Sequence, residues 1–162
     1  MAVRIYRVSE TDKKIAYGIV EEYYRAASVV VQEDLQKFAA EYFEAGAGVW
    51  LADVGGDHVG CVALRRLKEK PGCGEVKRLY VRPAYRGQGI ADLLLEAVEI
   101  YAKEFGDRWL YLDTAADMKA AQRFYERKGF LPCQRYNDNP QAAIFMRKAI
   151  GSNAVRSTRG LA

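Results

Sequence analysis

One stretch of the sequence joins a short strand, a tight turn and a long amphipathic helix, and it restricts the possible folds more than any other. The apolar, β-favouring run Leu79-Tyr80-Val81 lies within a strand predicted over residues 75–82. A glycine-containing turn then leads into a helix predicted over residues 90–105, whose apolar side chains recur at helical spacing along one side. A strand that leads directly into a core-covering helix predicts an α/β domain.

The turn between this strand and this helix has the composition of an anion-binding loop. Arg86, Gly87 and Gly89 stand where the first N–H groups of a helix have no intrahelical partner. A helix N-terminus also carries about half a positive charge, so the backbone there is suited to bind a phosphate. The alternative is a glycine turn that only connects strand and helix. The dinucleotide pattern G-x-G-x-x-G and the G-K-[ST] pattern of phosphate-binding NTPases are both absent.

The remaining residues predict a mixed α/β fold with the element order β-α-α-β-β-β-α-β-α-β-β. Residues 49–67 predict a hairpin about a double-glycine turn. Thr114 and Asp117 predict a capping box at the start of the last predicted helix, which ends at Gly129. Two strands are predicted over residues 130–136 and 142–148.

Composition narrows the class of protein. The chain has 162 residues, of which 50% are hydrophobic, which suits one domain over residues 1–150 with a flexible tail over residues 151–162. A net charge of +4 is too small to indicate nucleic-acid binding. Three cysteines and a single histidine support neither a disulfide framework nor a metal site. We see no secretory leader and no apolar run of the roughly 18 residues that cross a membrane, so a cytoplasmic location is expected.

The pattern Arg-x-x-Gly-x-Ala at Arg86, Gly89 and Ala91 resembles the pyrophosphate-binding motif of the GNAT superfamily of acyl-CoA-dependent N-acetyltransferases. The resemblance continues through residues 110–114 and 121–130, and residues 139–146 are similar to the closing hairpin of bacterial members. It implies one GNAT domain whose curved mixed sheet has about seven strands and about four flanking helices. It also implies that the two central strands splay apart and that acyl-CoA enters the gap.

The resemblance implies acetyl-CoA as cosubstrate, with no metal. The backbone of Leu79, Tyr80 and Val81 is expected to pair with the pantetheine arm and to polarise the acetyl carbonyl. The pyrophosphate is expected on the turn formed by Arg86, Gly87, Gln88, Gly89, Ile90 and Ala91.

Amide formation from a thioester and an amine needs help with two protons. An alkyl ammonium with a pKa near 10.4 is only about one part in a thousand neutral at pH 7, and the leaving thiolate has a pKa near 8.5. Tyr125 follows Phe124 at the position where GNAT enzymes commonly point a tyrosine at the coenzyme sulfur, so we predict that it assists the thiol. The alternative is that Tyr125 is a core residue at helical spacing.

Glu75 is the predicted base, and the alternative is an edge charge paired with Lys77 or Arg78. Asp113, at the end of the neighbouring strand, is the reserve candidate, with a cap or a salt bridge as its alternative role. Counting two residues per repeat along an unbroken strand places Glu75 on one face with Lys77, Leu79 and Val81.

Other residues bear on the site less directly. Many GNAT members carry an asparagine six residues before the phenylalanine of the Phe-Tyr pair, where this chain has Met118. Tyr23, Tyr24 and Tyr42 have core spacing, although the first helices of this fold often border the acceptor pocket. His58, beside a hairpin turn, is expected to be a surface strand residue rather than a catalyst.

The predicted function is an N-acetyltransferase that transfers the acetyl group of acetyl-CoA to a primary amine by direct attack in a ternary complex. The acceptor is expected to be a small molecule or an amino-acid derivative, and a protein N-terminus or a lysine is the alternative acceptor. The rival hypothesis is a non-catalytic acyl-CoA-binding or partner-binding domain with the same fold. A nucleotide hydrolase is disfavoured because the phosphate-loop lysine is missing. No nucleic-acid or membrane partner is expected, and homodimers are common in the family, but the sequence fixes no interface.

Overall fold

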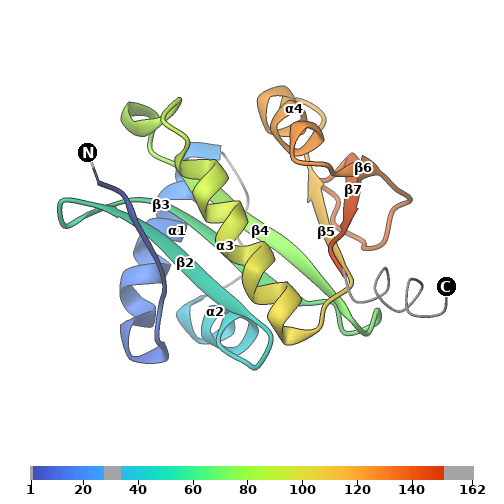
Figure 1. Cartoon of the computed structure of the whole chain (residues 1–162), viewed down its shortest axis with the longest axis horizontal. Helices are drawn as coiled ribbons and strands as arrows, with labels where there is room; N and C mark the ends of the chain where they lie inside the picture. Colours follow the sequence, from blue (N-terminus) through green and yellow to red (C-terminus); the bar gives the residue numbers. More distant parts are fainter. Residues whose placement is uncertain (1, 28–33, 152–162) are drawn as a thin grey trace, which may run out of the picture.

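The computed structural model of the protein describes residues 2–27 and 34–151. The predicted tail lies outside these residues from position 152 onward, so the domain boundary at residue 150 stays a prediction. The elements, in chain order and as labelled in Figure 1, are β1 (Arg4–Arg7), η1 (Glu10–Asp12), α1 (Lys13–Ala27), α2 (Leu35–Tyr42), β2 (Gly48–Val54), β3 (Asp57–Arg66), β4 (Cys73–Val81), η2 (Pro83–Tyr85), α3 (Ile90–Phe105), β5 (Trp109–Thr114), α4 (Lys119–Arg127), β6 (Leu131–Pro132) and β7 (Ile144–Ala149).

The strands form one seven-stranded mixed sheet in the order β1-β2-β3-β4-β5-β7-β6. Among the described strands only β4 and β5 run parallel, and α3 makes the crossover between them. This confirms the predicted mixed α/β fold with about seven strands and about four helices. The predicted helix over residues 90–105 and the hairpin are confirmed as well.

Two hydrophobic cores lie on opposite faces of the sheet. The larger core includes Val98 of α3 and Tyr125 of α4, and the smaller one includes Ile19 of α1 and Phe38 of α2. Figure 1 shows α3 in front of the sheet with α1 and α2 behind it. The inner strands β2 and β3 send alternate apolar side chains into both cores, which explains their nearly continuous hydrophobic runs. None of the described helices meets the length and apolarity that a membrane-spanning helix needs.

The two central strands separate after three residue pairs. β4 pairs with β5 only over residues 73–75, opposite residues 109–111, whereas β5 stays paired with β7 as far as Thr114. Beyond Glu75, the edge of β4 that faces β5 is therefore unpaired within the described chain. This is the splay that the family resemblance implies.

Because of a β-bulge in β4, the side chains beyond it lie on the opposite face of the sheet from the one predicted. The register between β3 and β4 shifts between Cys61 and Ala63, and Arg78 lies in the left-handed region with φ 59°. A bulge inserts one extra residue, which exchanges the two faces beyond it. Leu79 and Val81 accordingly pack against the core under α3 and α4, not on the face of Glu75 as unbroken alternation predicted.

Two further local predictions are wrong. Thr114 is the last residue of β5 and α4 begins only at Lys119 with Met118 as its N-cap, so Thr114 and Asp117 form no capping box. The strand predicted over residues 130–136 shortens to β6, and the chain after it is a loop over residues 133–143 that leads into the neighbouring strand β7. That loop contributes polar side chains to the site described next.

Candidate active site

A groove of about 580 Å³ runs along the unpaired edge of β4, from the turn before α3 to α4. Of the predicted cofactor-binding residues, all except Gln88 line this groove. Its walls come from four segments that are distant in sequence: the end of α1, the second half of β4, the turn with the first residues of α3, and one face of α4. The fold thus brings the predicted phosphate turn and the predicted catalytic tyrosine to one continuous groove.

The turn before α3 presents its backbone donors to open space. Gly87 and Gly89 both lie in the left-handed region, with φ 77° and 82°. A Cβ built on either glycine meets no atom within 4 Å, so the need for glycine is conformational and the space in front of the turn is clear. Within the described chain, no acceptor engages the backbone N–H groups of residues 87–92, and the first N–H bonded back is that of Leu93, to the Gly89 carbonyl oxygen at 3.2 Å.

Arg86 fixes the turn to the end of β4. Its Nε donates a 2.8 Å hydrogen bond to the carbonyl oxygen of Val81, and its guanidinium lies 5.9 Å from the ring centroid of Tyr80. A few residues earlier, Arg82 pairs with Glu22 of α1 at 2.9 Å. These contacts hold the strand end, the turn and the first helix in one arrangement, with a cation beside the unpaired backbone N–H groups.

A second cavity, of about 350 Å³, lies on the other side of Tyr125. Both cavities are lined by Tyr23, Ala27, Leu79, Met118, Ala121 and Tyr125. The second cavity adds polar and charged side chains from β4, β5 and the loop before β7, including Lys77, Asp113 and Asn139. The two spaces therefore meet at Tyr125, one with backbone N–H groups that have no acceptor in the described chain and the other with paired charges.

Tyr125 lies on α4 with 8% of its surface exposed, and Phe124 and Phe130 contact its ring edge to face. Burial raises the pKa of Tyr125 well above the usual value of a tyrosine, and Tyr23 and Asp113 act in the same direction. No described residue accepts a hydrogen bond from its hydroxyl group. The phenol is therefore a neutral donor that faces the junction of the two cavities.

Glu75 is fully buried beneath the split in the sheet, and both of its oxygens are bonded. Oε1 accepts from Nε of Arg65 at 2.7 Å, and Oε2 accepts from the hydroxyl of Tyr136 at 2.6 Å and from Nδ2 of Asn137 at 3.3 Å. Its ion-pair partner is thus Arg65, the residue opposite it on β3, rather than Lys77 or Arg78. Glu75 lines neither cavity, and its assignment as the base stays a prediction.

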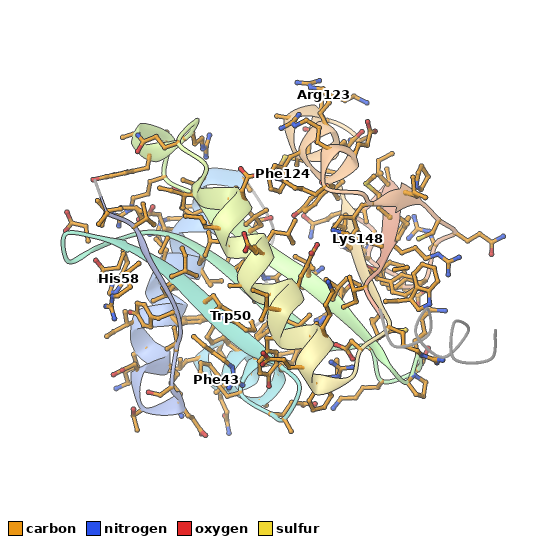
Figure 2. The ribbon with its side chains drawn as sticks, in the orientation of Figure 1. Phe43, Trp50, His58, Arg123, Phe124 and Lys148 are labelled. Atoms are coloured by element: carbon orange, nitrogen blue, oxygen red, sulfur yellow. The ribbon has the colours of Figure 1, made fainter. Side chains whose placement is uncertain are left out.

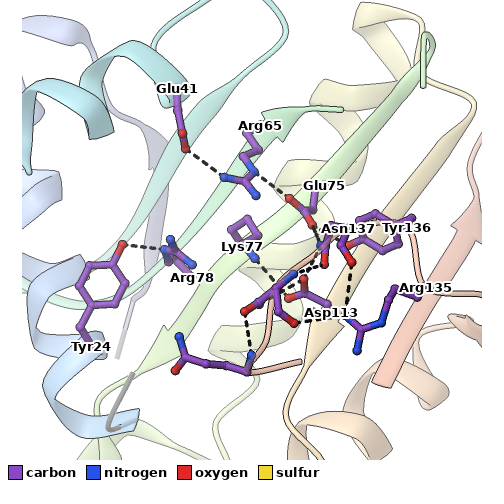
Figure 3. Close-up of polar contacts among 12 residues, drawn as sticks. Tyr24, Glu41, Arg65, Glu75, Lys77, Arg78, Asp113, Arg135, Tyr136 and Asn137 are labelled. Carbon is purple, nitrogen blue, oxygen red and sulfur yellow. Dashed lines mark hydrogen bonds and ion pairs between the residues drawn. The ribbon is translucent and has the colours of Figure 1, made fainter. Parts of the chain in front are cut away.

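Asp113 lies at the wall of the second cavity and is held by three donors (Figure 3). Lys77 Nζ lies 3.2 Å from Oδ1, and Asn137 and Asn139 donate to Oδ2 at 2.6 and 3.4 Å. Burial acts to raise the pKa of Asp113, but the charge of Lys77 and the hydrogen bonds outweigh it, so the pKa lies below its usual value. Asn137 bonds to both Asp113 and Glu75 and so links the two carboxylates.

Arg65, Tyr136 and Asn137 were missed by reasoning from the sequence. Arg65 is one of several arginines in strand patterns, residue 136 ends one predicted strand, and residue 137 begins the polar segment between the two predicted strands. No local signal distinguishes them, because their role arises from contacts with Glu75 across 10 to 62 positions of sequence.

The other sequence candidates lie as follows. Tyr23 lines both cavities, Tyr24 accepts from Arg78 Nε at 2.7 Å, and Tyr42 is buried in the smaller core. His58 lies beside the turn of the β2–β3 hairpin, and its Nε2 is 2.8 Å from the Tyr6 hydroxyl. Figure 2 shows His58 on the opposite side of the molecule from Phe124, which lines the groove. The described residues contain no group of three or more potential metal ligands.

Comparison with known families decides where this arrangement belongs. The model of the acetyltransferase (GNAT) family matches residues 14–130, which is more than half of the chain. The chain belongs to the GNAT acetyltransferase family. This confirms the family resemblance that was carried by the turn at Arg86, Gly89 and Ala91.

Relatives of this GNAT chain include an uncharacterized N-acetyltransferase of Schizosaccharomyces pombe, 38% identical over 96 residues that cover 59% of this chain and 58% of that protein. The rat N-acetyltransferase family 8 member 2 is 33% identical over 109 residues, covering 65% of this chain and 48% of that protein. The chain thus spans about half of the length of these curated relatives. Their names agree with the predicted acyltransferase class.

Solved GNAT structures share the fold. A GNAT acetyltransferase of Staphylococcus aureus superposes with a TM-score of 0.78 at 22% identity, over 92% of this chain and 99% of that chain. The PaiA N-acetyltransferase of Thermoplasma acidophilum, solved in complex with coenzyme A, superposes with a TM-score of 0.71 at 18% identity, again over 92% and 99%. At these identities the likeness establishes the GNAT fold of this chain.

Proposed function

We propose that this GNAT chain is an N-acetyltransferase that transfers the acetyl group of acetyl-CoA to a primary amine by direct attack in a ternary complex. The acceptor is a small molecule or an amino-acid derivative. One observation carries the proposal: a groove that begins at a row of backbone N–H groups with no acceptor in the described chain meets a charged cavity at Tyr125. Two joined spaces of this kind suit two substrates that react where the spaces meet.

The chain's own groups fit a CoA thioester. The backbone N–H groups of the turn over residues 87–92, with Arg86 beside them, would hold the pyrophosphate, since a helix N-terminus favours anions. The unpaired edge of β4 beyond Glu75 offers main-chain donors and acceptors to the amides of the pantetheine arm. A thioester supplies an activated acyl group, and an N–H group of Leu79–Val81 would polarise its carbonyl oxygen.

Tyr125 would serve the sulfur as a hydrogen-bond donor. Its pKa is raised by burial, whereas a thiol has a pKa near 8.5, so complete transfer of its proton to the leaving thiolate is uphill. A hydrogen bond from a neutral phenol to a thiolate stabilises the leaving group without that transfer. The apolar surroundings of the ring strengthen the bond because they exclude water.

Two carboxylates are candidates for taking the proton of the amine, and both remain in the proposal. Glu75, the predicted base, would need to exchange one of its three hydrogen bonds for the amine or for a bridging water in order to act. Asp113, the reserve candidate, already lines the cavity that contains Tyr125. Neutralising an ammonium at pH 7 costs about 4 to 5 kcal/mol, so the assignment has a large kinetic consequence.

The alternative function is a non-catalytic acyl-CoA-binding domain, and Met118 favours it. This side chain stands where many family members carry asparagine, and it lines both cavities, so it reduces the polar groups available to the cosubstrate. The hydroxyl of Tyr125 favours catalysis, because Tyr125 lines both cavities and no described residue accepts a hydrogen bond from it. We also propose a cytoplasmic location, because the described cysteines are all free thiols, which suits a reducing compartment.

The test is calorimetric binding of acetyl-CoA to the wild type, to Gly89→Glu and to a matched control, Gly56→Glu. Both glycines have positive φ and open space at Cβ, but Gly56 lies in the hairpin turn away from the groove. We expect the wild type and Gly56→Glu to bind and Gly89→Glu to lose binding. Release of free thiol with a panel of amines then separates an enzyme from a binding domain. Absence of binding by the wild type overturns the proposal.

A further inference from the structure

We infer that the acceptor is an amine that also carries a carboxylate, as in an amino acid, and that the ion pair between Lys77 and Asp113 recognises its two charged groups. This inference names the substrate class of the proposed acetyl transfer and rests on that function. It is carried by the position of the pair in the second cavity, by the donors that Lys77 leaves open, and by the charge balance of the cavity wall.

The pair bridges the split between the central strands. Lys77 comes from β4 and Asp113 from β5, beyond the point where the two strands stop pairing, and Nζ lies 3.2 Å from Oδ1. Only 9% and 4% of the two side chains are exposed, yet both line the cavity that Tyr125 closes at one side. Figure 3 shows the two side chains meeting between the strands. A ligand that fills this cavity therefore contacts both charges.

The two partners are bonded unequally. Asp113 is fixed by Asn137 and Asn139 in addition to Lys77. An ammonium can donate three hydrogen bonds, and among the described residues Lys77 Nζ donates to Asp113 alone. Lys77 is thus a nearly buried cation with donors left for a further acceptor, and a carboxylate is the acceptor that best compensates its charge.

The charges that line the cavity cancel. Among the described lining residues, Lys77 and Arg78 are cations and Asp113 and Asp117 are anions. An acceptor with one ammonium and one carboxylate preserves that balance, because the amine binds Asp113 and the carboxylate binds Lys77. A diamine or a simple amine brings an uncompensated positive charge into a confined space, which is costly.

The orientation of such an acceptor suits acetyl transfer. Asp113 lines the cavity together with Leu79 and Tyr125, which mark its junction with the groove. An amine held at Asp113 therefore lies in the same cavity as the proposed reaction centre. Arg78 is directed away to Tyr24 of α1, with Nε 2.7 Å from the hydroxyl, so Lys77 is the better carboxylate partner.

The experiment compares matched acceptors that differ only in the carboxylate. Each set contains an amino acid, its carboxamide and the corresponding amine without the carboxyl group, with small, polar and aromatic side chains represented. We measure kcat/KM from thiol release for the wild type, Lys77→Gln, Lys77→Arg and the control Lys103→Gln. Lys103 is an exposed lysine of α3 that lines neither cavity.

We expect the wild type to prefer the amino acid over its carboxamide by about 10- to 100-fold, the effect of one charge-assisted hydrogen bond. Lys77→Gln should reduce that preference to near unity, Lys77→Arg should retain most of it, and Lys103→Gln should leave it unchanged. A structural role for the pair would change the rates of all acceptors alike. If Lys77→Gln fails to fold, the ratio of kcat/KM for the amino acid to that for its carboxamide in the wild type still tests the substrate class.

Two results overturn the inference. If the wild type acetylates carboxamides or simple amines as well as the amino acids, the substrate class is wrong although the acetyl transfer stands. If acetyl-CoA binds but no acceptor releases thiol, or acetyl-CoA does not bind, the proposed function fails and this inference fails with it. Acetyl-CoA calorimetry on the same samples distinguishes these cases.

Discussion

The carboxylate of Glu75 lies 2.7 Å from Nε of Arg65, and the two residues stand opposite each other in the ladder between β3 and β4. Arg65 also donates a hydrogen bond to Glu41 of α2 at 3.0 Å, and the other oxygen of Glu75 accepts one from the hydroxyl of Tyr136 (Figure 3). The pair therefore ties the second helix and the loop before β7 to the strand that lines the site.

Glu75→Gln should lower the free energy of unfolding by about 2 to 4 kcal/mol, because it removes the fully buried one of the two carboxylates that pair with Arg65. Urea unfolding monitored by circular dichroism measures this loss. The control is Glu41→Gln, where both partners are about 30% exposed and the loss should stay below about 1 kcal/mol. Equal effects of the two variants would contradict a special role for the buried pair.

Tyr125→Phe should lower kcat by about 10- to 100-fold while acetyl-CoA binding changes little, because the lost hydrogen bond acts on the leaving thiolate. The ring keeps its contacts with Phe124 and Phe130, so the variant should unfold at nearly the wild-type temperature. Tyr101→Phe, on the α3 surface against Trp50, is the matched control. Unchanged turnover of Tyr125→Phe would make Tyr125 a core residue, as its spacing allows.

The contribution of Tyr125 should persist at alkaline pH. An acid whose pKa is raised stays protonated to higher pH, so the burial that raises the pKa of Tyr125 keeps the phenol a donor beyond the usual tyrosine value near 10. The ratio of wild-type kcat/KM to that of Tyr125→Phe should therefore stay constant between about pH 7 and pH 10. Steady-state kinetics across that range checks this, and a ratio that falls towards one would mean that the phenol ionises.

The two amide variants Asp113→Asn and Glu75→Gln separate the two candidate bases. Because Asp113 lines the acceptor cavity, we expect Asp113→Asn to lower kcat/KM by about 100-fold or more and Glu75→Gln to lower it less. Both are measured on folded protein well below the unfolding temperature. A larger loss in Glu75→Gln would assign the base to Glu75 instead.

Acid should weaken the stabilising effect of Asp113. A carboxylate whose pKa is lowered on folding contributes stability above its unfolded pKa of about 3.8, and that contribution is lost as the pH falls through the lower folded value. The advantage of the wild type over Asp113→Asn in free energy of unfolding should thus be full near pH 6 and shrink below about pH 4. Urea titrations at several pH values measure it, and an advantage that grows in acid would reverse the assignment.

Local patterns were sufficient for the strand, turn and helix that form the cofactor side of the site. The predicted helix begins at Ile90 and ends at Phe105 in the structure, since its start is set by Gly89 and its end by Gly106, both with positive φ. The groove residues follow from the same stretch, because neighbours in sequence stay neighbours in a tight turn. The family resemblance added the splay of the sheet, which no local pattern indicates.

Local sequence patterns could not predict which face of the sheet the side chains of β4 occupy, or which residues bond to the carboxylate of Glu75. The bulge at Arg78 depends on how β4 pairs with β3, and alternation along β4 alone gives the wrong face for Leu79 and Val81. The capping box at Thr114 failed for a related reason, because pairing with β7 extends β5 through that residue.

The sequence by itself determined the fold class, the family and the turn that offers backbone donors to an anion, because each depends on residues that are adjacent in the chain. Only the tertiary structure decided that Glu75 is fully bonded beneath the sheet and that Lys77 and Asp113 meet in the cavity beside Tyr125. The physical reason is that burial and charge pairing are properties of space, and they join side chains from strands and loops that lie tens of residues apart.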